Sequence, residues 1–312
     1  MNSAPGVSSL TLQAAAKVNL CLRVLGRRAD GYHEVETVLH TVGLWDRVTL
    51  VERPTGISVE VVRGEAPEGE ANLCWQAASL LAERTSIRLG ERGVSIELEK
   101  TIPPRSGLGG GSSDAAAALV GLCRLWGIDP PRRAADELAS MAAELGADVP
   151  FFLRGGCCLA RGKGEKLVPC PEMSAWLVLV APERGVSTHQ GYAALRRGAT
   201  LGRRRAPSRP IQRFLDALKG GDLASIGAAL HNDFEAAKIA GIDDALRAKR
   251  ELLAGGCLGA TMSGSGSAVF GLARDHAQAE QVAAALRANW PWVAVAPMVG
   301  AGSHLVEESQ SG

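Results

Sequence analysis

The stretch that decides the fold runs Ile102-Pro-Pro-Arg-Ser-Gly-Leu-Gly-Gly-Gly-Ser-Ser-Asp114 and continues as Ala115-Ala-Ala-Ala-Leu-Val-Gly-Leu-Cys-Arg-Leu-Trp126. Before it, residues 94–99 alternate apolar and polar side chains, as in a half-buried strand. After it, apolar side chains recur at helical spacing at Ala115, Ala118, Leu119, Leu122 and Leu125. The sequence therefore predicts a strand, a glycine loop and a helix.

The loop has the chemistry of a phosphate cradle. Its glycines, which permit positive φ and place no Cβ between the backbone N–H groups and a ligand, are Gly107, Gly109, Gly110 and Gly111. Either Ser112 or Ser113 can cap the helix, whose N-terminal N–H groups then face the same anion. Gly127 is typical of the residue just after a helix. A tight turn without a ligand is the open alternative.

Asp114, in the first helical turn, is the feature that disagrees with a phosphate site. Its carboxylate would repel a phosphate unless it points away or meets a cation, and Mg²⁺ would resolve that conflict. The loop is also not a Walker A motif, because no Gly-Lys-Ser/Thr closes it. A dinucleotide-binding domain would place the loop after the first strand, not a third of the way along the chain.

Composition indicates a globular protein with room for two domains. The chain has 312 residues, 46% hydrophobic and 21% charged, with a net charge of +1, so neither DNA nor a membrane surface is favoured as an electrostatic partner. Seven cysteines without a C-x-x-C spacing are typical of reduced core residues. No apolar run reaches membrane-spanning length and the first ten residues resemble no targeting signal, so we expect a cytoplasmic protein.

Polar residues in the first strands are candidates for a site. Residues 10–25 read as a long strand in which Lys17 and Asn19 share one face. A lysine in an apolar strand must reach solvent or a charged partner. In the following turn, Tyr32 offers a stacking surface and His33 can hydrogen-bond a base edge. Lys17 could instead extend to solvent from an edge strand, and Tyr32 and His33 could be ordinary residues of a surface loop.

Asp148 is the candidate reactive carboxylate. It lies in Gly146-Ala-Asp-Val-Pro-Phe-Phe152, where little water is expected, so it needs a cation or a reacting hydroxyl nearby. The alternative is a simple loop cap.

The remaining elements give an α+β chain that divides near residue 169, where Pro169 and Pro171 interrupt it. We expect an N-terminal domain of residues 1–168, with further strands at 35–42, 47–52 and 57–62 and helices at 72–83 and 132–145. We expect a C-terminal domain of residues 169–312. It should have a fully buried strand at 175–181, a further strand at 292–299, and helices at 211–219, 223–234, 245–254 and 277–289. A glycine-serine turn follows Met262, and the tail after Ser303 should fray.

Two further features belong to the C-terminal half. A helix beginning near Ser187 carries Tyr192, and residues 198–210 hold Arg203, Arg204, Arg205 and Arg209 among glycine and proline. The arginine segment is predicted to be a solvated loop, and a basic lid over an anionic substrate is its alternative.

Taken together, five motifs resemble the 4-diphosphocytidyl-2-C-methyl-D-erythritol kinases, which belong to the superfamily of galactokinase, homoserine, mevalonate and phosphomevalonate kinases. They are Ala16-Lys-Val-Asn-Leu20, Arg28-Ala-Asp-Gly-Tyr-His33, Gly107-Leu-Gly-Gly-Gly-Ser-Ser-Asp-Ala-Ala116, Gly146-Ala-Asp-Val-Pro150 and Ser263-Gly-Ser-Gly-Ser267. The glycine loop marks the superfamily, and the Tyr-His segment beside Ala-Lys-Val-Asn marks the diphosphocytidyl branch.

The resemblance implies a two-domain fold, ribosomal-protein-S5-like at the N-terminus and ferredoxin-like at the C-terminus, with the active site in the cleft between them. It implies ATP-dependent phosphorylation of a hydroxyl of the cytidyl substrate in non-mevalonate isoprenoid synthesis, with Mg²⁺. Asp148 resembles the catalytic base and Lys17 its cationic neighbour. The partner would be a small molecule, with no nucleic acid or membrane, in a monomer or weak homodimer.

The resemblance also assigns binding residues. Lys100 resembles a residue lining the nucleotide site, and the ATP phosphates would lie on Pro104, Arg105, Ser106, Gly107, Leu108, Gly109, Gly110, Gly111, Ser112 and Ser113. The cytosine would be held by Tyr32 and His33, with Asn19 nearby and Tyr192 as a second stacking ring. Pro103-Pro-Arg-Ser106 departs from the small residues common in the family, and residues 188–190 vary among relatives.

Three other functions are possible for a chain with such a glycine loop, and each predicts different sequence features. A homoserine or mevalonate-type kinase would not need the Tyr32-His33 pair. A nucleotide-binding regulator without activity would be expected to lack the lysine or the carboxylate, and both are present. An oxidoreductase is disfavoured by the late position of the loop.

Overall fold

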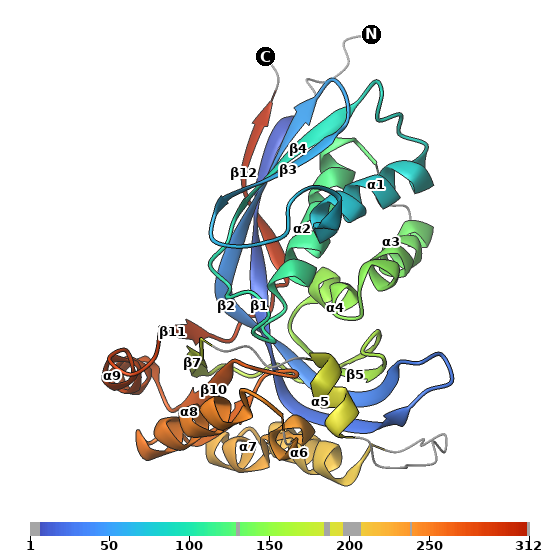
Figure 1. Cartoon of the computed structure of the whole chain (residues 1–312). Helices are drawn as coiled ribbons and strands as arrows, with labels where there is room; N and C mark the ends of the chain where they lie inside the picture. The colour runs from blue at the N-terminus through green and yellow to red at the C-terminus, as the bar shows by residue number, and fades with distance from the viewer. Residues whose placement is uncertain (1–6, 129–131, 184–187, 196–206, 238, 311–312) are drawn as a thin grey trace.

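Two β-sheets form the frame of the fold (Figure 1). The computed structural model describes residues 7–128, 132–183, 188–195, 207–237 and 239–310. In the described part of the chain the first sheet has the order β12-β1-β2-β4-β3, with β5 and β8 also paired to β2 and β1 and β6 paired to β5. The second sheet has the order β11-β7-β10-β9.

The strands have the following bounds: β1 Val7–Arg27, β2 His33–Arg53, β3 Ile57–Arg63, β4 Gly93–Glu99, β5 Cys157–Gly162, β6 Lys166–Pro169, β7 Trp176–Ala181, β8 His231–Asn232, β9 Gly259–Met262, β10 Val269–Ala273, β11 Trp292–Pro297 and β12 Ser303–Gln310. The helices are α1 Leu73–Thr85, α2 Gly110–Leu125, α3 Arg132–Leu145, α4 Val149–Arg154, α5 Thr188–Ala194, α6 Arg209–Gly220, α7 Leu223–Ala229, α8 Ile242–Ala254 and α9 His276–Leu286, with 3₁₀ turns η1 Gly69–Ala71 and η2 Asp233–Ala236. None of the helices in these described ranges is both long and apolar enough to span a membrane.

The antiparallel pair β1 and β2 runs the length of the first sheet (Figure 1). Each strand has 21 residues, so the two strands predicted at 35–42 and 47–52 are parts of one. The register shifts between Ala15 and Ala16 and again between Asn19 and Cys21. Such bulges bend a strand and redirect its side chains, and these two bracket Lys17 and Asn19.

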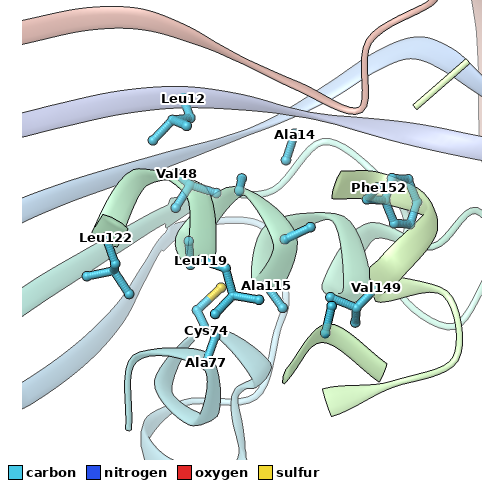
Figure 2. Packing of buried hydrophobic residues seen from close by; sticks show 14 of the residues in the cluster. Leu12, Ala14, Val48, Cys74, Ala77, Ala115, Leu119, Leu122, Val149 and Phe152 are labelled. Carbon is cyan, nitrogen blue, oxygen red and sulfur yellow. The ribbon is translucent and has the colours of Figure 1, made fainter. Parts of the chain in front are cut away.

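Helix α2 is the central element of the N-terminal core. Figure 2 shows its apolar side chains between the sheet, represented by Leu12 and Val48, and Cys74 and Ala77 of α1. Gly121 permits this close packing, because an added Cβ would lie 2.5 Å from Leu50 Cδ1. The helix terminates before Gly127, as predicted, and Gly127 has a φ of +63°. The next residue closes the helix end, because the Ile128 N–H donates to the Cys123 carbonyl at 2.8 Å.

Strand β7 lies between two apolar layers. Leu177 and Leu179 pack into the cluster between the two sheets, while Val178 and Val180 pack with α8 and α9 on the opposite face. The prediction of a buried strand is confirmed from Leu177 to Ala181, whereas Trp176 is half-buried. The two sheets are thus joined by continuous apolar packing, which fixes how the loops at their border meet.

Two predicted elements were wrong. The tail after Ser303 does not fray, because β12 pairs antiparallel with β1 from Ala14↔Ser303 to Val7↔Gln310. The helix predicted at 223–234 ends at Ala229, and the chain then extends as β8, which pairs with β1 at Cys21↔His231. Both segments had no signal in their own sequence for a partner more than 200 residues away.

The domain boundary near residue 169 stays a prediction. It falls between β6 of the first sheet and β7 of the second, but β8 and β12 return to the first sheet. Arg203, Arg204 and Arg205 of the proposed basic lid lie outside the described residues, whereas Arg209 begins α6.

Candidate active site

The glycine loop is packed against the second glycine-serine turn. Gly107 has φ of +83°, and an added Cβ there would lie 2.2 Å from the Ser263 carbonyl oxygen. The Ser263 hydroxyl donates to the Gly107 carbonyl at 3.0 Å, and the Ala268 N–H donates to the Ser106 carbonyl at 2.9 Å. A merely mobile turn would not need this fit, so the loop has one defined shape.

Helix α2 begins directly from the loop. Its N-cap is Gly109 with φ of +80°, and the first helical bond runs from Ser113 N–H to the Gly109 carbonyl at 2.9 Å. The prediction that Ser112 or Ser113 caps the helix was wrong, because the helix starts earlier and both serines lie within its first turns. The N–H groups of the first turn have no partner inside a helix and are available to an anion.

The other loop residues divide into supporting and exposed ones. The Ser106 side chain is buried and its hydroxyl donates to the Pro103 carbonyl at 2.7 Å. Leu108 is buried in the core, and its carbonyl accepts the Lys17 N–H at 2.9 Å. Pro104 and Arg105 are exposed. Ser106 and Leu108 can therefore face a ligand only through their backbone.

Lys17 is the buried cation of the site. Its ammonium donates to Asn19 Oδ1 and to the Gly107 carbonyl, both at 2.6 Å, and lies 3.8 Å from Asp148 Oδ2. Its side chain is 3% exposed, so the alternative of a lysine reaching to solvent is excluded. Burial lowers the pKa of Lys17, and the negative charge of Asp148 opposes that effect.

Asp148 is placed as a reactive group would be. It precedes α4 but makes no capping hydrogen bond with its side chain, which does not support the simple cap. Its side chain is 37% exposed, so it is open to a ligand while Lys17 behind it is not. Its charge also reaches Tyr192, since burial and then Asp148 raise the pKa of that phenol to about 12.

Asn19 connects the site to both sheets. Its amide donates to Thr37 Oγ1 at 2.9 Å, and its backbone N–H donates to Ser263 Oγ at 3.3 Å. Asn232 then fixes the second turn by donating to the carbonyls of Met262 at 2.7 Å and Gly264 at 2.8 Å. Neither Thr37 nor Asn232 was among the predicted site residues, because each is an isolated polar residue without a motif around it.

An aromatic surface adjoins this centre. His33 stacks on Tyr192 with ring centroids 4.4 Å apart and 19° between the planes, and Tyr192 packs edge-on against Phe234. Tyr32 does not share the stack: it is 59% exposed, with the Lys163 ammonium 4.5 Å from its ring centroid. The structure thus brings His33 and Tyr192 together and leaves Tyr32 at the rim.

Lys100 lies in a buried charge cluster. Its ammonium donates to carboxylate oxygens of Asp46 and Asp114. The cation that meets Asp114 is therefore Lys100, and no Mg²⁺ is needed for that purpose. Asp46 carried no sequence signal, since a single acidic residue in a strand reveals nothing of its partners.

Comparison with known proteins defines the class. Residues 72–156 match the GHMP kinases N terminal domain and residues 214–291 match the GHMP kinases C terminal domain. A crystal structure of a homoserine kinase from Cytophaga hutchinsonii, 22% identical, superimposes with a TM-score of 0.73 over 98% of this chain and 100% of the other, which shows the shared fold. The fold and the glycine loop are those of a GHMP-type small-molecule kinase.

Closer relatives define the family. The chain is 44% identical over 286 residues to the 4-diphosphocytidyl-2-C-methyl-D-erythritol kinase of Pelotomaculum thermopropionicum, covering 89% of this chain and 94% of that one. A crystal structure of a 4-(cytidine 5'-diphospho)-2C-methyl-D-erythritol kinase matches with 37% identity and a TM-score of 0.77, over 93% of this chain and 100% of the other. The chain belongs to the 4-diphosphocytidyl-2-C-methyl-D-erythritol kinase family.

Proposed function

We propose that this protein transfers the γ-phosphoryl group of ATP to a hydroxyl of 4-diphosphocytidyl-2-C-methyl-D-erythritol, giving the 2-phosphate, a step of non-mevalonate isoprenoid precursor synthesis. The observation that carries the proposal is the position of Lys17. Its ammonium donates to the Gly107 carbonyl of the glycine loop and lies 3.8 Å from the Asp148 carboxylate. A phosphate donor and a hydroxyl acceptor would meet there.

In this proposal Asp148 takes the proton of the acceptor hydroxyl. Its half-buried carboxylate is open to a ligand, and no capping bond occupies its oxygens. The buried ammonium of Lys17 lies 3.8 Å from that carboxylate and faces the charge that develops on the transferring group. The two short bonds to Asn19 and Gly107 hold that ammonium in place before substrate arrives.

ATP would lie with its phosphates on the loop, where Gly109 begins α2 and the free N–H groups of the first turn supply donors. Mg²⁺ is usually held by substrate phosphates, waters and one or two protein oxygens, and a site of that kind needs no metal cluster made by the protein alone. Ser112, half-buried in the first turn of α2, is the proposed protein ligand. The ion would neutralise the phosphate charge during transfer.

The cytidyl group would bind at the aromatic surface. His33 supplies hydrogen bonds to the base edge, Tyr192 supplies a stacking face and Tyr32 can cover the base from the rim. Asn19, which accepts a hydrogen bond from the Lys17 ammonium, is the proposed neighbour of this group. A homoserine or mevalonate-type acceptor has no flat ring, so the aromatic surface favours the cytidyl substrate.

The test is ADP release by purified protein with ATP, Mg²⁺ and one of three acceptors: the diphosphocytidyl compound, mevalonate or homoserine. We expect turnover only with the cytidyl compound. Turnover with another acceptor would keep the phosphate loop and overturn the substrate. ADP binding with no turnover on any acceptor would favour a regulator. Cytoplasmic location, independence of nucleic acid, and a monomeric or weakly dimeric state stay predictions.

A further inference from the structure

A buried charge cluster lies beneath the glycine loop. It consists of Asp46 on β2, Lys100 directly after β4 and Asp114 in α2, and the Lys100 ammonium donates to Oδ2 of both aspartates. The exposed fractions of the three side chains are 0%, 5% and 3%. The cluster therefore holds two carboxylates and one ammonium away from solvent, which is a costly arrangement for stability alone.

The cluster joins the two ends of the loop. Asp46 Oδ1 accepts the N–H of Thr101 at 2.6 Å and of Ile102 at 2.9 Å, where the chain leaves β4. The same carboxylate lies close against the start of α2, since a Cβ added to Gly110 would lie 3.1 Å from Asp46 Oδ2. Lys100 completes the link by holding Asp114 in the helix that the loop enters.

We propose that Asp46, Lys100 and Asp114 are positioning residues for nucleotide binding: they clamp the beginning and the end of the loop, and Lys100 acts through Asp114 without touching the nucleotide. The inference rests on the proposed nucleotide site. Seven of the eleven loop residues from 103 to 113 are glycine or serine, so an unclamped loop would lose much conformational entropy on binding. A clamp removes that loss before the phosphate arrives.

The electrostatics show that each member depends on the others. Burial raises the pKa of Asp114 to about 7, with Lys100 opposing and Asp46 adding to the shift. Burial acts to lower the pKa of Lys100, but Asp114 and Asp46 outweigh it and the net shift is upward. Among the described residues Asp114 Oδ1 has no hydrogen-bond partner, and Lys100 is the cation that holds Oδ2 of the same side chain. Removing Lys100 or the Asp114 side chain should release the same contact.

The decisive experiment is a double-mutant cycle on nucleotide affinity. Lys100→Met, Asp114→Ala and the double variant are titrated with Mg-ADP by calorimetry without acceptor, and KM is measured for ATP and for the cytidyl acceptor. We expect each single change to weaken ADP binding by about 10-fold or more, since small displacements of a binding group are expensive. The double variant should bind no more weakly than Lys100→Met, because Asp114→Ala removes a contact that Lys100→Met has already broken.

Two further variants make the cycle interpretable. Asp114→Asn keeps an oxygen for Lys100 and should bind ADP within about 3-fold of the wild type. Lys249→Met removes another lysine from an ion pair, with Glu235 of η2, and should leave ADP affinity unchanged. The KM for the acceptor should stay near its wild-type value in all variants.

Three outcomes would overturn the inference. Weak ADP binding in Lys100→Met with normal binding in Asp114→Ala would make Lys100 a direct nucleotide ligand. Equal rises of both KM values together with a lower melting temperature would leave only a structural role. Normal ADP binding in Asp114→Ala would refute the clamp even if Lys100→Met does not fold. A wild-type protein that binds no ADP would instead refute the proposed function.

Discussion

Lys17 and Asp148 face each other across 3.8 Å, with the lysine side chain 3% exposed and the aspartate side chain 37% exposed. The pair is asymmetric: the cation is enclosed and held by two further acceptors, whereas the carboxylate is open on the side where a ligand can approach. This asymmetry distinguishes a reactive pair from a structural salt bridge, in which both partners are usually satisfied by each other.

Asp148→Asn should abolish the base without disturbing the fold. Loss of general-base catalysis lowers turnover by about 10²- to 10⁴-fold, and we expect kcat to fall by that factor while Mg-ADP binds normally. Steady-state kinetics and calorimetry check this. Asp216→Asn on the exposed side of α6 is the matched control and should behave as wild type. Near-normal kcat in Asp148→Asn would remove it as the base.

Lys17→Met should lower the melting temperature more than Asp148→Asn does. The change removes two charge-assisted hydrogen bonds of 2.6 Å, to the Gly107 carbonyl and to Asn19 Oδ1, and leaves only the neutral Ser263 hydroxyl near these acceptors. Hydrogen bonds to charged groups contribute about 1.5–3 kcal/mol each. We expect a lower melting temperature together with a loss of kcat of at least about 100-fold. If thermal unfolding shifts and kcat does not, the lysine is structural only.

His33→Ala and Tyr32→Ala should raise the KM for the cytidyl acceptor and leave the KM for ATP unchanged. Aromatic stacking on a base contributes about 1–3 kcal/mol, so a rise of about 10-fold is expected where a ring contacts the cytosine. His33 should have the larger effect, since it is the ring already ordered against Tyr192. An unchanged acceptor KM in both variants would take the pair out of the substrate site.

Gly107→Ala and Gly111→Ala should distinguish a glycine that is needed for the backbone conformation from a glycine that is needed for contact with the phosphates. At Gly107 an added Cβ would lie 2.2 Å from a backbone oxygen at positive φ, so the protein should be destabilised. At Gly111 the nearest atom is Leu73 Cδ1 at 3.9 Å, and alanine should stabilise α2 by up to about 1 kcal/mol. If Gly111 faces the phosphates, its variant melts higher yet binds Mg-ADP more weakly. Unimpaired binding would place the phosphates elsewhere.

The pH dependence of stability should carry the signature of Asp114. Its pKa is raised from 3.8 to about 7 when the chain folds, so the native state binds the extra proton in that range. This contribution to stability is complete below the unfolded pKa and is lost as pH rises towards 7. The groups that face Asp114 are Lys100, Asp46 and the thiol of Cys74, whose own pKa is raised well above its usual value.

Asp114→Asn removes this titration. The melting temperature of the variant relative to the wild type should therefore increase between pH 5 and pH 8, as the wild type loses the stabilising proton. Parallel thermal unfolding curves across that range check the sign. A constant difference between the two proteins would show that Asp114 does not titrate in this window.

The local pattern of the sequence determined the strand, glycine loop and helix at 94–126, the two-sided burial of β7 and the common face of Lys17 and Asn19. These features depend on periodicity and on backbone freedom, which are properties of neighbouring residues. The loop motifs also identified Asp148 as the carboxylate to examine, and the comparisons confirmed the family.

Only the tertiary structure decided which distant groups meet. It placed β12 beside β1, His33 against Tyr192, Asn232 under the second glycine-serine turn, and Lys100 between Asp46 and Asp114. An isolated charge in a sequence shows that a partner is needed, because burying it alone is unfavourable, but not which residue supplies it. That choice depends on the packing of two sheets whose strands come from both ends of the chain.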